Sequence, residues 1–337
     1  MVARPAIRSG FMRIIEGGNV GLSVDLAPNN PHHLKLANPV MIASGTFGYD
    51  GYGRGITPDM DLGLLGAVIP KTVTRQPREG NPEPRWYPAS YREALADGEC
   101  IFLNSIGLTN PGIESALTTL APEWSRQDAT MILSLSAESV SEFGEMTAMT
   151  QGVSGFQALE LNLSCPNIEN GALFSHSAAL TADAVAAVRA NTGLPVLAKL
   201  APNVPDVSEI ALAAVGAGAD ALTISNTLPA MQIDIESRQP VLGSVTGGLS
   251  GHGLRPVALA LVYRAAQVVD VPIIGVGGIF NAGHALEYFL AGATAVQIGS
   301  ANLADLWSPF RILDELKVYL GEAGVSDIGE LVGAVQT

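Results

Sequence analysis

The chain has 337 residues, of which 47% are hydrophobic, and a formal net charge of −14. This composition supports a large core, and the acidic balance lacks the basic patches that a nucleic-acid partner requires. Two cysteines, Cys100 and Cys165, are too few for a disulfide framework and predict a protein of the reducing cytoplasm.

The N-terminal segment, Met1 to Asn19, carries charges and glycines but no long apolar stretch, so no signal peptide is expected. Elsewhere no apolar run approaches the ~20 residues that cross a membrane. The run Val271–Ile279 is far too short. We therefore expect a cytoplasmic protein without a membrane segment.

Short apolar runs recur along the chain, and polar or glycine-rich residues follow each one. The runs are Pro39–Gly45, Ala67–Val73, Thr130–Ser136, Ala158–Cys165, Pro195–Ala201, Ala221–Thr227, Val271–Ile279 and Ala295–Ser300. Strands of a parallel sheet have this character because both of their faces are covered. The pattern predicts eight buried strands.

Segments with helical periodicity lie between these runs. They are Ala179–Asn191, Val207–Gly216, Pro256–Val269 and Ala282–Ala291. Gly216 and Gly292 stand where helix C-caps are expected. Strands that alternate with helices predict a parallel sheet, and eight such units favour a (β/α)8 barrel over an open doubly wound sheet. We expect one α/β domain, a TIM barrel with an eight-stranded parallel core, over residues 1–337.

Two segments fall outside this alternation. Residues 20–37 are expected to form a small N-terminal β cap, a hairpin under the barrel. Residues 75–99 are rich in proline and glycine and too long for a plain strand-to-helix connection. Loops of that length are usually functional or disordered, and we expect this one on the side of the active site.

The stretch Ala158–Asn167 holds the most informative cluster of side chains. Its strand must end before Pro166, which has no backbone N–H to donate. Cys165, Asn162 and Asn167 therefore gather at the carboxyl end of a strand, where parallel α/β folds carry their sites. A lone cysteine is more often structural, but two amides beside it are costly to bury without a polar ligand.

Polar residues also lie at the carboxyl ends of other predicted strands. Lys71 and Lys199, on separate predicted buried strands, stand out because a buried ammonium needs an anionic partner. Gly277-Gly278 and Gly299-Ser300 follow the seventh and eighth strands, where barrels commonly bind a phosphate. These glycines could serve only tight turns, yet a third glycine-rich loop at Thr246–Gly251 adds weight to an anion site.

Other candidate sites are weak. Asn104–Pro111 could hold a small carboxylate near Gly107 or could be an ordinary turn. The histidines show no metal-ligand spacing, so no metal is expected. A hydrolase is not indicated either, because the chain lacks a Gly-x-Ser-x-Gly elbow.

Taken together, these motifs resemble the dihydroorotate dehydrogenases of pyrimidine biosynthesis, from about Leu22 to Phe310. The matching motifs are Ala43–Gly45, Pro70–Thr72, Gly80–Arg85, Asn104–Leu108, Glu160–Asn167, Lys199–Asn203, Asn226–Leu228, Thr246–Gly251, Gly277-Gly278 and Gly299–Asn302. The resemblance implies an oxidoreductase, an FMN-containing (β/α)8 barrel that oxidises dihydroorotate to orotate.

The resemblance implies that Cys165 is the catalytic base. It would remove a proton from C5 of dihydroorotate while C6 delivers hydride to N5 of the flavin. A thiol suits this task because its ordinary pKa of about 8.5 is close to neutral. The family's membrane-bound, quinone-using class has a serine in this place, so Cys165 indicates the soluble class.

The resemblance also implies the ligand contacts. The residues expected at the substrate are Lys71, Asn104, Ser105, Ile106, Gly107, Leu108, Asn162, Asn167, Asn226 and Thr227. Those expected at FMN are Ser44, Lys71, Thr72, Ser134, Asn162, Lys199, Ser225, Gly251, Gly277, Gly278, Gly299 and Ser300, the last four at its phosphate. Amides suit a pyrimidine because its edges offer donors and acceptors. Lys199 would face flavin N1/O2, where negative charge builds on reduction.

Gly80–Arg85 and Thr246–Gly251 resemble the NAD-linked subtype, in which the barrel works with a second subunit that carries FAD and a [2Fe–2S] cluster. This chain has no dinucleotide fingerprint. Its two cysteines are also too few for a cluster held by four thiolates. Electrons would then reach NAD through the partner subunit, and a homodimeric core or a heterotetramer is expected.

Three alternatives stay open. A fumarate-using soluble subtype would share the barrel and the catalytic cysteine. A flavoprotein like dihydropyrimidine dehydrogenase would prefer dihydrouracil to dihydroorotate. A barrel that binds a phosphorylated ligand without catalysis would be colourless when purified and would take up no FMN.

Overall fold

Eight parallel strands form the centre of the computed structural model, which describes residues 20–48, 50–57, 59–92, 101–164 and 173–336. Their order in the sheet is β4-β3-β16-β15-β10-β9-β8-β7. The strands are β3 (Val40–Ile42), β4 (Ala67–Val68), β7 (Ile132–Leu135), β8 (Ala158–Asn162), β9 (Val196–Leu200), β10 (Ala221–Ile224), β15 (Ile273–Val276) and β16 (Ala295–Ile298). Parallel bridges from Val68 to Met131 and from Val73 to Leu135 join the two end strands. The predicted (β/α)8 barrel is confirmed.

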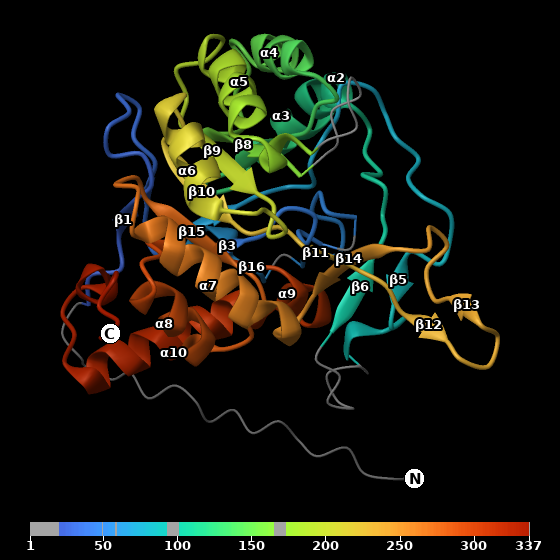
Figure 1. The fold of residues 1–337 in the computed structure, drawn as a ribbon. Helices are drawn as coiled ribbons and strands as arrows, with labels where there is room; N and C mark the ends of the chain where they lie inside the picture. The colour runs from blue at the N-terminus through green and yellow to red at the C-terminus, as the bar shows by residue number, and fades with distance from the viewer. Residues whose placement is uncertain (1–19, 49, 58, 93–100, 165–172, 337) are drawn as a thin grey trace.

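Helices connect the strands around the outside of the barrel (Figure 1). They are α2 (Ile113–Ser115), α3 (Ala121–Trp124), α4 (Val140–Met149), α5 (Ala178–Arg189), α6 (Val207–Gly216), α7 (Arg255–Ala266), α8 (Ala282–Leu290), α9 (Ser300–Ala304) and α10 (Ser308–Ala323). Short turns add η1 (Leu62–Leu64), η2 (Ala116–Leu120), η3 (Phe174–His176), η4 (His252–Leu254) and η5 (Ile328–Leu331). Within the described ranges, no helix has both the length and the apolar character needed to cross a membrane.

Local sequence signals fix where several of these helices begin. Ser139, Ser177, Asp206 and Asn281 precede α4, α5, α6 and α8, and each side chain accepts a hydrogen bond from a backbone N–H of the first turn. Such caps satisfy N–H groups that have no partner within the helix. The four predicted helical segments correspond to α5, α6, α7 and α8 and appear within a few residues of their expected bounds.

Two details of the sequence prediction were wrong. The strand β4 ends at Val68, so Lys71 follows the strand and does not lie in it. Pro70 accounts for the early end because it has no N–H to give to a ladder. Gly216 is the last residue of α6, and the left-handed residue beyond the helix is Gly218, with φ of 104°. Gly292, with φ of 111°, follows α8 as expected.

The N-terminal cap is an antiparallel pair of short strands, β1 (Val24–Asp25) and β2 (Lys35–Leu36). Leu26, Leu34 and Leu36 are buried in the core cluster. The amide of Asn30 donates to the carboxylate of Asp220, at 3.2 and 3.3 Å, and Asp220 directly precedes β10. The cap therefore covers the amino ends of the barrel strands and leaves their carboxyl ends to other segments.

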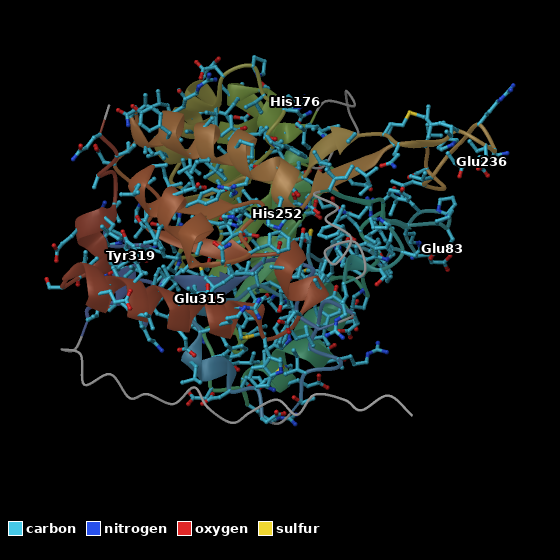
Figure 2. The ribbon with its side chains drawn as sticks, turned by 90° about the horizontal axis from the view of Figure 1, so that it is seen from below. Glu83, His176, Glu236, His252, Glu315 and Tyr319 are labelled. Atoms are coloured by element: carbon cyan, nitrogen blue, oxygen red, sulfur yellow. The ribbon has the colours of Figure 1, made fainter. Side chains whose placement is uncertain are left out.

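A second sheet, which the sequence patterns did not predict, stands apart from the cap (Figure 1). Its antiparallel order is β11-β14-β6-β5, from β11 (Leu228–Ala230), β14 (Gly247–Ser250), β6 (Phe102–Asn104) and β5 (Trp86–Tyr87). The hairpin of β12 (Ile233–Asp234) and β13 (Gln239–Pro240) extends outward beside it, near Glu236 in Figure 2. The long segment 75–99 thus contains a strand, β5.

The segment Thr246–Gly251, expected as a glycine-rich loop, is mostly the strand β14. Glycine and serine have low strand propensity, which hid this strand from pattern reasoning. The glycines are required by close packing: a Cβ on Gly248 would clash with Thr227 Oγ1, and one on Gly247 would lie 2.6 Å from the Asn104 carbonyl oxygen.

The last long helix, α10, tests how strongly the outer helices stabilise the barrel. It packs against β3 and α8, and Leu316 is fully buried while Tyr319, on the same helix, is 44% exposed. Leu316→Ala should lower the free energy of unfolding by ~2–5 kcal/mol, because it removes buried contacts and leaves a cavity. The control Tyr319→Ala should change it by less than ~1 kcal/mol. Urea unfolding measures both, and equal losses would contradict this account of the core.

Candidate active site

A cavity of about 490 Å³ lies at the carboxyl ends of the barrel strands, between the barrel and the second sheet. Its size is within the ~300–1000 Å³ that is usual for sites of small molecules and cofactors. The predicted site residues that line it are Ser44, Lys71, Thr72, Asn104, Ser105, Ile106, Gly107, Leu108, Asn162, Lys199, Ser225, Asn226, Thr227, Gly277, Gly278, Gly299 and Ser300. Cys165 and Asn167 lie outside the described residues.

Two other predicted residues, Ser134 and Gly251, lie behind the cavity wall. Ser134 is buried and its hydroxyl is 2.8 Å from that of Thr72, which is in turn 3.0 Å from that of Ser44. A Cβ added to Gly278 would lie 2.7 Å from the carbonyl oxygen of Gly251. Both residues therefore support neighbours that line the cavity, and their contact with a cofactor stays a prediction.

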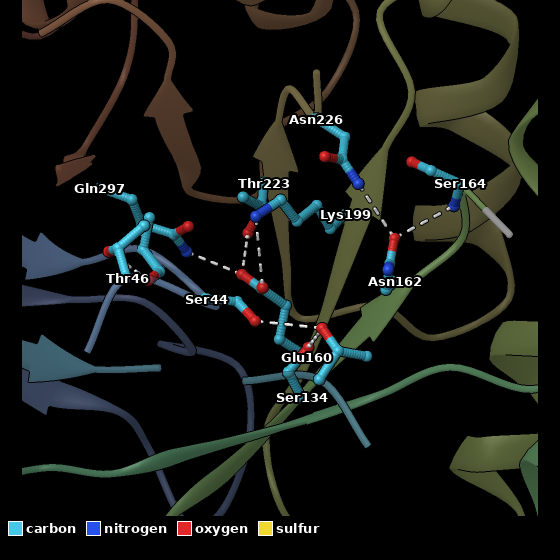
Figure 3. A network of polar contacts seen from close by, with 12 residues as sticks. Ser44, Thr46, Ser134, Glu160, Asn162, Ser164, Lys199, Thr223, Asn226 and Gln297 are labelled. Carbon is cyan, nitrogen blue, oxygen red and sulfur yellow. Dashed lines mark hydrogen bonds and ion pairs between the residues drawn. The ribbon is translucent and has the colours of Figure 1, made fainter. Parts of the chain in front are cut away.

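Two amide side chains meet at one side of the cavity (Figure 3). Asn162 ends β8 and Asn226 follows β10. The Asn226 amide donates to Asn162 Oδ1 at 3.1 Å, and the backbone N–H of Ser164 donates to the same oxygen at 3.3 Å. The N–H of Thr227 donates to Asn226 Oδ1 at 2.8 Å. These contacts fix both amides, and no hydrogen bond within the described part of the chain engages the NH₂ group of Asn162, which suits it to a ligand.

Lys71 lies against two glycines with left-handed backbones, Gly45 (φ 80°) and Gly51 (φ 82°). A Cβ on Gly45 would lie 3.2 Å from Lys71 Nζ, and one on Gly51 would lie 2.8 Å from Lys71 Cβ. The backbone N–H of Lys71 also donates to the Gly51 carbonyl at 2.8 Å. The glycines thus leave room for the lysine stem to reach the cavity.

The glycine turns after β15 and β16 form another part of the wall. Gly277 and Gly278 have φ of 137° and 64°, which only glycine adopts readily. The hydroxyl of Tyr288 donates to the Gly277 carbonyl at 2.7 Å. Burial raises the pKa of Tyr288 well above its usual value, so this hydroxyl keeps its proton and remains a donor. Ser300 donates to the hydroxyl of Ser250 at 2.8 Å, which ties this turn to β14.

Several lining residues were not among the predicted ligand contacts. Thr46, Trp86 and Tyr91 were missed altogether, whereas Ser164, Asn203, Thr246, Gly247, Gly248 and Ser250 lie in recognised motifs but were given no contact. Trp86 and Tyr91 form an edge-to-face pair with ring centroids 5.5 Å apart, and Tyr91 stacks obliquely on Phe102. The pairing of β5 with β6 brings these rings to the cavity, and no periodic pattern in the sequence predicted that pairing. A lone tryptophan in the proline-rich segment was the sole available signal.

The charges of the described lining residues have one sign. Lys71 and Lys199 line the cavity, and no aspartate or glutamate of the described chain does so. Amides, hydroxyls and glycine backbone make up most of the remaining polar surface. Such a donor set fits ligands that carry negative charge and a flat polar ring. Ser164 Oγ is buried without a partner among the described residues, which also fits a polar ligand.

Comparison with known proteins agrees with this chemistry. A protein family described as dihydroorotate dehydrogenase matches residues 27–320. A protein of Desulforudis audaxviator is 47% identical over 302 residues, 89% of this chain and 94% of that protein. Relatives in Desulforamulus reducens (44% identical, over 89% of this chain and 95% of the relative) and Geotalea uraniireducens (41%, over 95% and 100%) are also similar. All three relatives are named dihydroorotate dehydrogenase B (NAD(+)), catalytic subunit.

The packing of Gly51 against Lys71 can be tested by stability. Gly51→Ala combines an unfavourable φ with a contact of 2.8 Å to Lys71, whereas a Cβ added to Gly152, which has φ of 75°, would meet no heavy atom within 4 Å. The control Gly152→Ala should cost about 1–2 kcal/mol of unfolding free energy, for the left-handed backbone alone. Gly51→Ala should cost a further ~1–3 kcal/mol, for overpacking. Equal losses of unfolding free energy in the two variants would show that the Lys71 side chain moves aside without strain.

Proposed function

The chain belongs to the dihydroorotate dehydrogenase family, and we propose that it is the FMN-binding catalytic subunit of an NAD-linked enzyme. As a member of this family it is an oxidoreductase that oxidises dihydroorotate, a step of pyrimidine biosynthesis. The observation that carries the proposal is the joint presence of Lys71, Lys199 and the paired amides Asn162 and Asn226 in one cavity. The carboxylate of the pyrimidine accounts for one cation, Lys71, and the flavin ring, which gains negative charge on reduction, accounts for the other, Lys199.

The residues present fit FMN. The phosphate would bind at the turns Gly277-Gly278 and Gly299-Ser300, where side chains are absent or small and backbone groups are accessible to an anion. Ser44, Thr72 and Ser225 would hold the flavin, with Ser134 and Gly251 behind them, and Lys199 would face N1/O2. When bound, FMN supplies the ring that accepts hydride from C6 of dihydroorotate. We infer a single FMN-binding domain over residues 1–337.

In this proposal the chain's own residues hold the substrate. Lys71 pairs with the substrate carboxylate, and the backbone and side chains of Asn104–Leu108 enclose it. Asn162, Asn167, Asn226 and Thr227 bind the pyrimidine edge, because amides offer both donors and acceptors. The cavity positions of all but Asn167 support this assignment.

Cys165 is the proposed base that removes the proton from C5. Asn162 lines the cavity at the end of β8, and Cys165 follows three residues later in the chain. Three residues of extended chain span at most ~11 Å, a length of chain that is compatible with the proposed role. A base on one side of the ring and a hydride acceptor on the other would divide the oxidation between two groups.

The partner subunit is proposed from the relatives and from what this chain lacks. The names of the relatives specify NAD(+) and a catalytic subunit, which implies a second subunit in those enzymes. This sequence has no dinucleotide fingerprint and only two cysteines. We therefore assign FAD and a [2Fe–2S] cluster to a partner, in a cytoplasmic assembly built on a homodimeric core or a heterotetramer.

The role of Cys165 is tested by substitution. Cys165→Ser should retain bound FMN but reduce it at least ~100-fold more slowly with dihydroorotate at neutral pH, because a hydroxyl ionises less readily than a thiol. The residual rate should rise with pH. Stopped-flow absorbance of the bound flavin without oxygen measures the rate. Cys100→Ser, the matched control, should react at the wild-type rate, and full activity in Cys165→Ala would refute the assignment.

The electron acceptor is tested with the isolated chain. With dihydroorotate it should reduce small dyes or oxygen but not NAD, and addition of the FAD and iron–sulfur subunit should restore NAD reduction. Steady-state assays with dihydroorotate and dihydrouracil in parallel also test the substrate. Fast NAD reduction by the chain alone would contradict the need for a partner, and rapid turnover with fumarate would indicate the other soluble subtype.

A further inference from the structure

Glu160 is a carboxylate inside the barrel, where branched apolar side chains usually fill the layers. It is fully buried on β8, two residues before Asn162 and therefore on the same face of the strand. Its Oε2 accepts hydrogen bonds from Thr223 Oγ1 of β10 at 3.0 Å and from Gln297 Nε2 of β16 at 2.7 Å. Figure 3 shows this carboxylate among residues from several strands.

The other carboxylate oxygen faces Lys199. Glu160 Oε1 has no hydrogen-bond partner in the described part of the chain, and Lys199 Nζ lies 3.7 Å from it. The strands β8 and β9 pair so that Asn162 is opposite Lys199. A distance of 3.7 Å is longer than a usual N–H···O bond of ~2.7–3.2 Å. The contact is therefore ionic, and the ammonium N–H groups are available to an acceptor in the cavity that Lys199 lines.

We propose that Glu160 is a positioning residue, which holds Lys199 at the cavity floor and balances its charge. Thr223 and Gln297 fix the carboxylate, and the carboxylate fixes the ammonium. The inference rests on the proposed function, because the group that Lys199 meets is the flavin. Its consequence is that the Glu160 carboxylate, 3.7 Å from the ammonium, limits how strongly Lys199 favours the reduced cofactor.

Three variants should change the midpoint potential of bound FMN, and the signs of these changes distinguish the proposed role from a merely structural one. Lys199→Met leaves a lone carboxylate below the cavity and should lower the midpoint potential of bound FMN, because reduction adds negative charge. Glu160→Gln leaves a lone ammonium and should raise it. The double variant has no net charge but lacks the ammonium that lines the cavity, so its potential should lie between those of the two single variants.

The experiment is a spectroscopic redox titration of the full chain with its bound FMN. Each single variant should shift the two-electron reduction equilibrium at least tenfold, which corresponds to about 30 mV. Asp220→Asn is the matched control, since Asp220 pairs with Arg189 at 2.6 Å before β10, at the other end of the barrel. It should leave the potential unchanged. Shifts of the same sign in both single variants, or an equal shift in the control, would overturn the proposal.

Urea unfolding of the FMN-free chain gives a second measurement that does not depend on the cofactor. Each single variant leaves a buried charge without its partner and should unfold at lower urea, whereas the double variant should recover part of the loss. If Glu160→Gln does not fold, Lys199→Met and the double variant can still be compared: removal of the lone carboxylate in the double variant should raise the midpoint potential above that of Lys199→Met. A wild-type chain that takes up no FMN contradicts the proposed function. The unfolding free energies of the four chains then test the ion pair alone. Recovery of stability in the double variant supports the pair, and a double-variant loss equal to the sum of the single losses overturns it.

Discussion

Closure of the eight-stranded sheet is the constraint on which the cavity depends. Parallel pairing fixes which residues stand at the same height: Lys199 lies opposite Asn162 on one neighbouring strand and opposite Thr223 on the other. Gln297 reaches Glu160 across the interior only because β16 and β8 belong to one closed sheet. Side chains separated by more than a hundred residues therefore meet at fixed positions, which a flexible loop could not ensure.

The charged side chains of the described residues that line the cavity are both lysines, although the chain as a whole is acidic. The chain as a whole carries a net charge of −14, so an anion at a distance is not attracted by it. Surface charges are screened over ~8–10 Å at physiological ionic strength, whereas charges within a cavity are screened less. Lys71 and Lys199, in the cavity wall, therefore dominate what an entering anion meets. Specific recognition here arises from local cations and amides, against the sign of the overall charge.

Sequence reasoning predicted the barrel and much of its cavity wall for identifiable reasons. Runs such as Pro195–Ala201 are apolar because a central parallel strand is covered on both faces, and polar residues just beyond them mark the carboxyl ends. The second sheet could not be predicted in this way: β5 has two residues, and β14 reads Gly-Gly-Leu-Ser. Glu160 was part of a matching motif, but its contacts could not be predicted, because its partners Thr223 and Gln297 are 63 and 137 residues away.

One carboxylate at each end of the barrel, partly buried Asp220 and fully buried Glu160, is satisfied to a different degree. Before β10, Asp220 accepts hydrogen bonds from Arg189, Asn30 and the backbone N–H of Val196, so its charge is fully engaged within the fold. At the cavity floor Glu160 keeps one oxygen without a hydrogen bond from the described residues, at 3.7 Å from the ammonium of Lys199. A satisfied network rigidifies the structure around it. An ion pair with unused donors, in contrast, can still respond to a charge that arrives in the cavity, so loss of each carboxylate should have a different consequence.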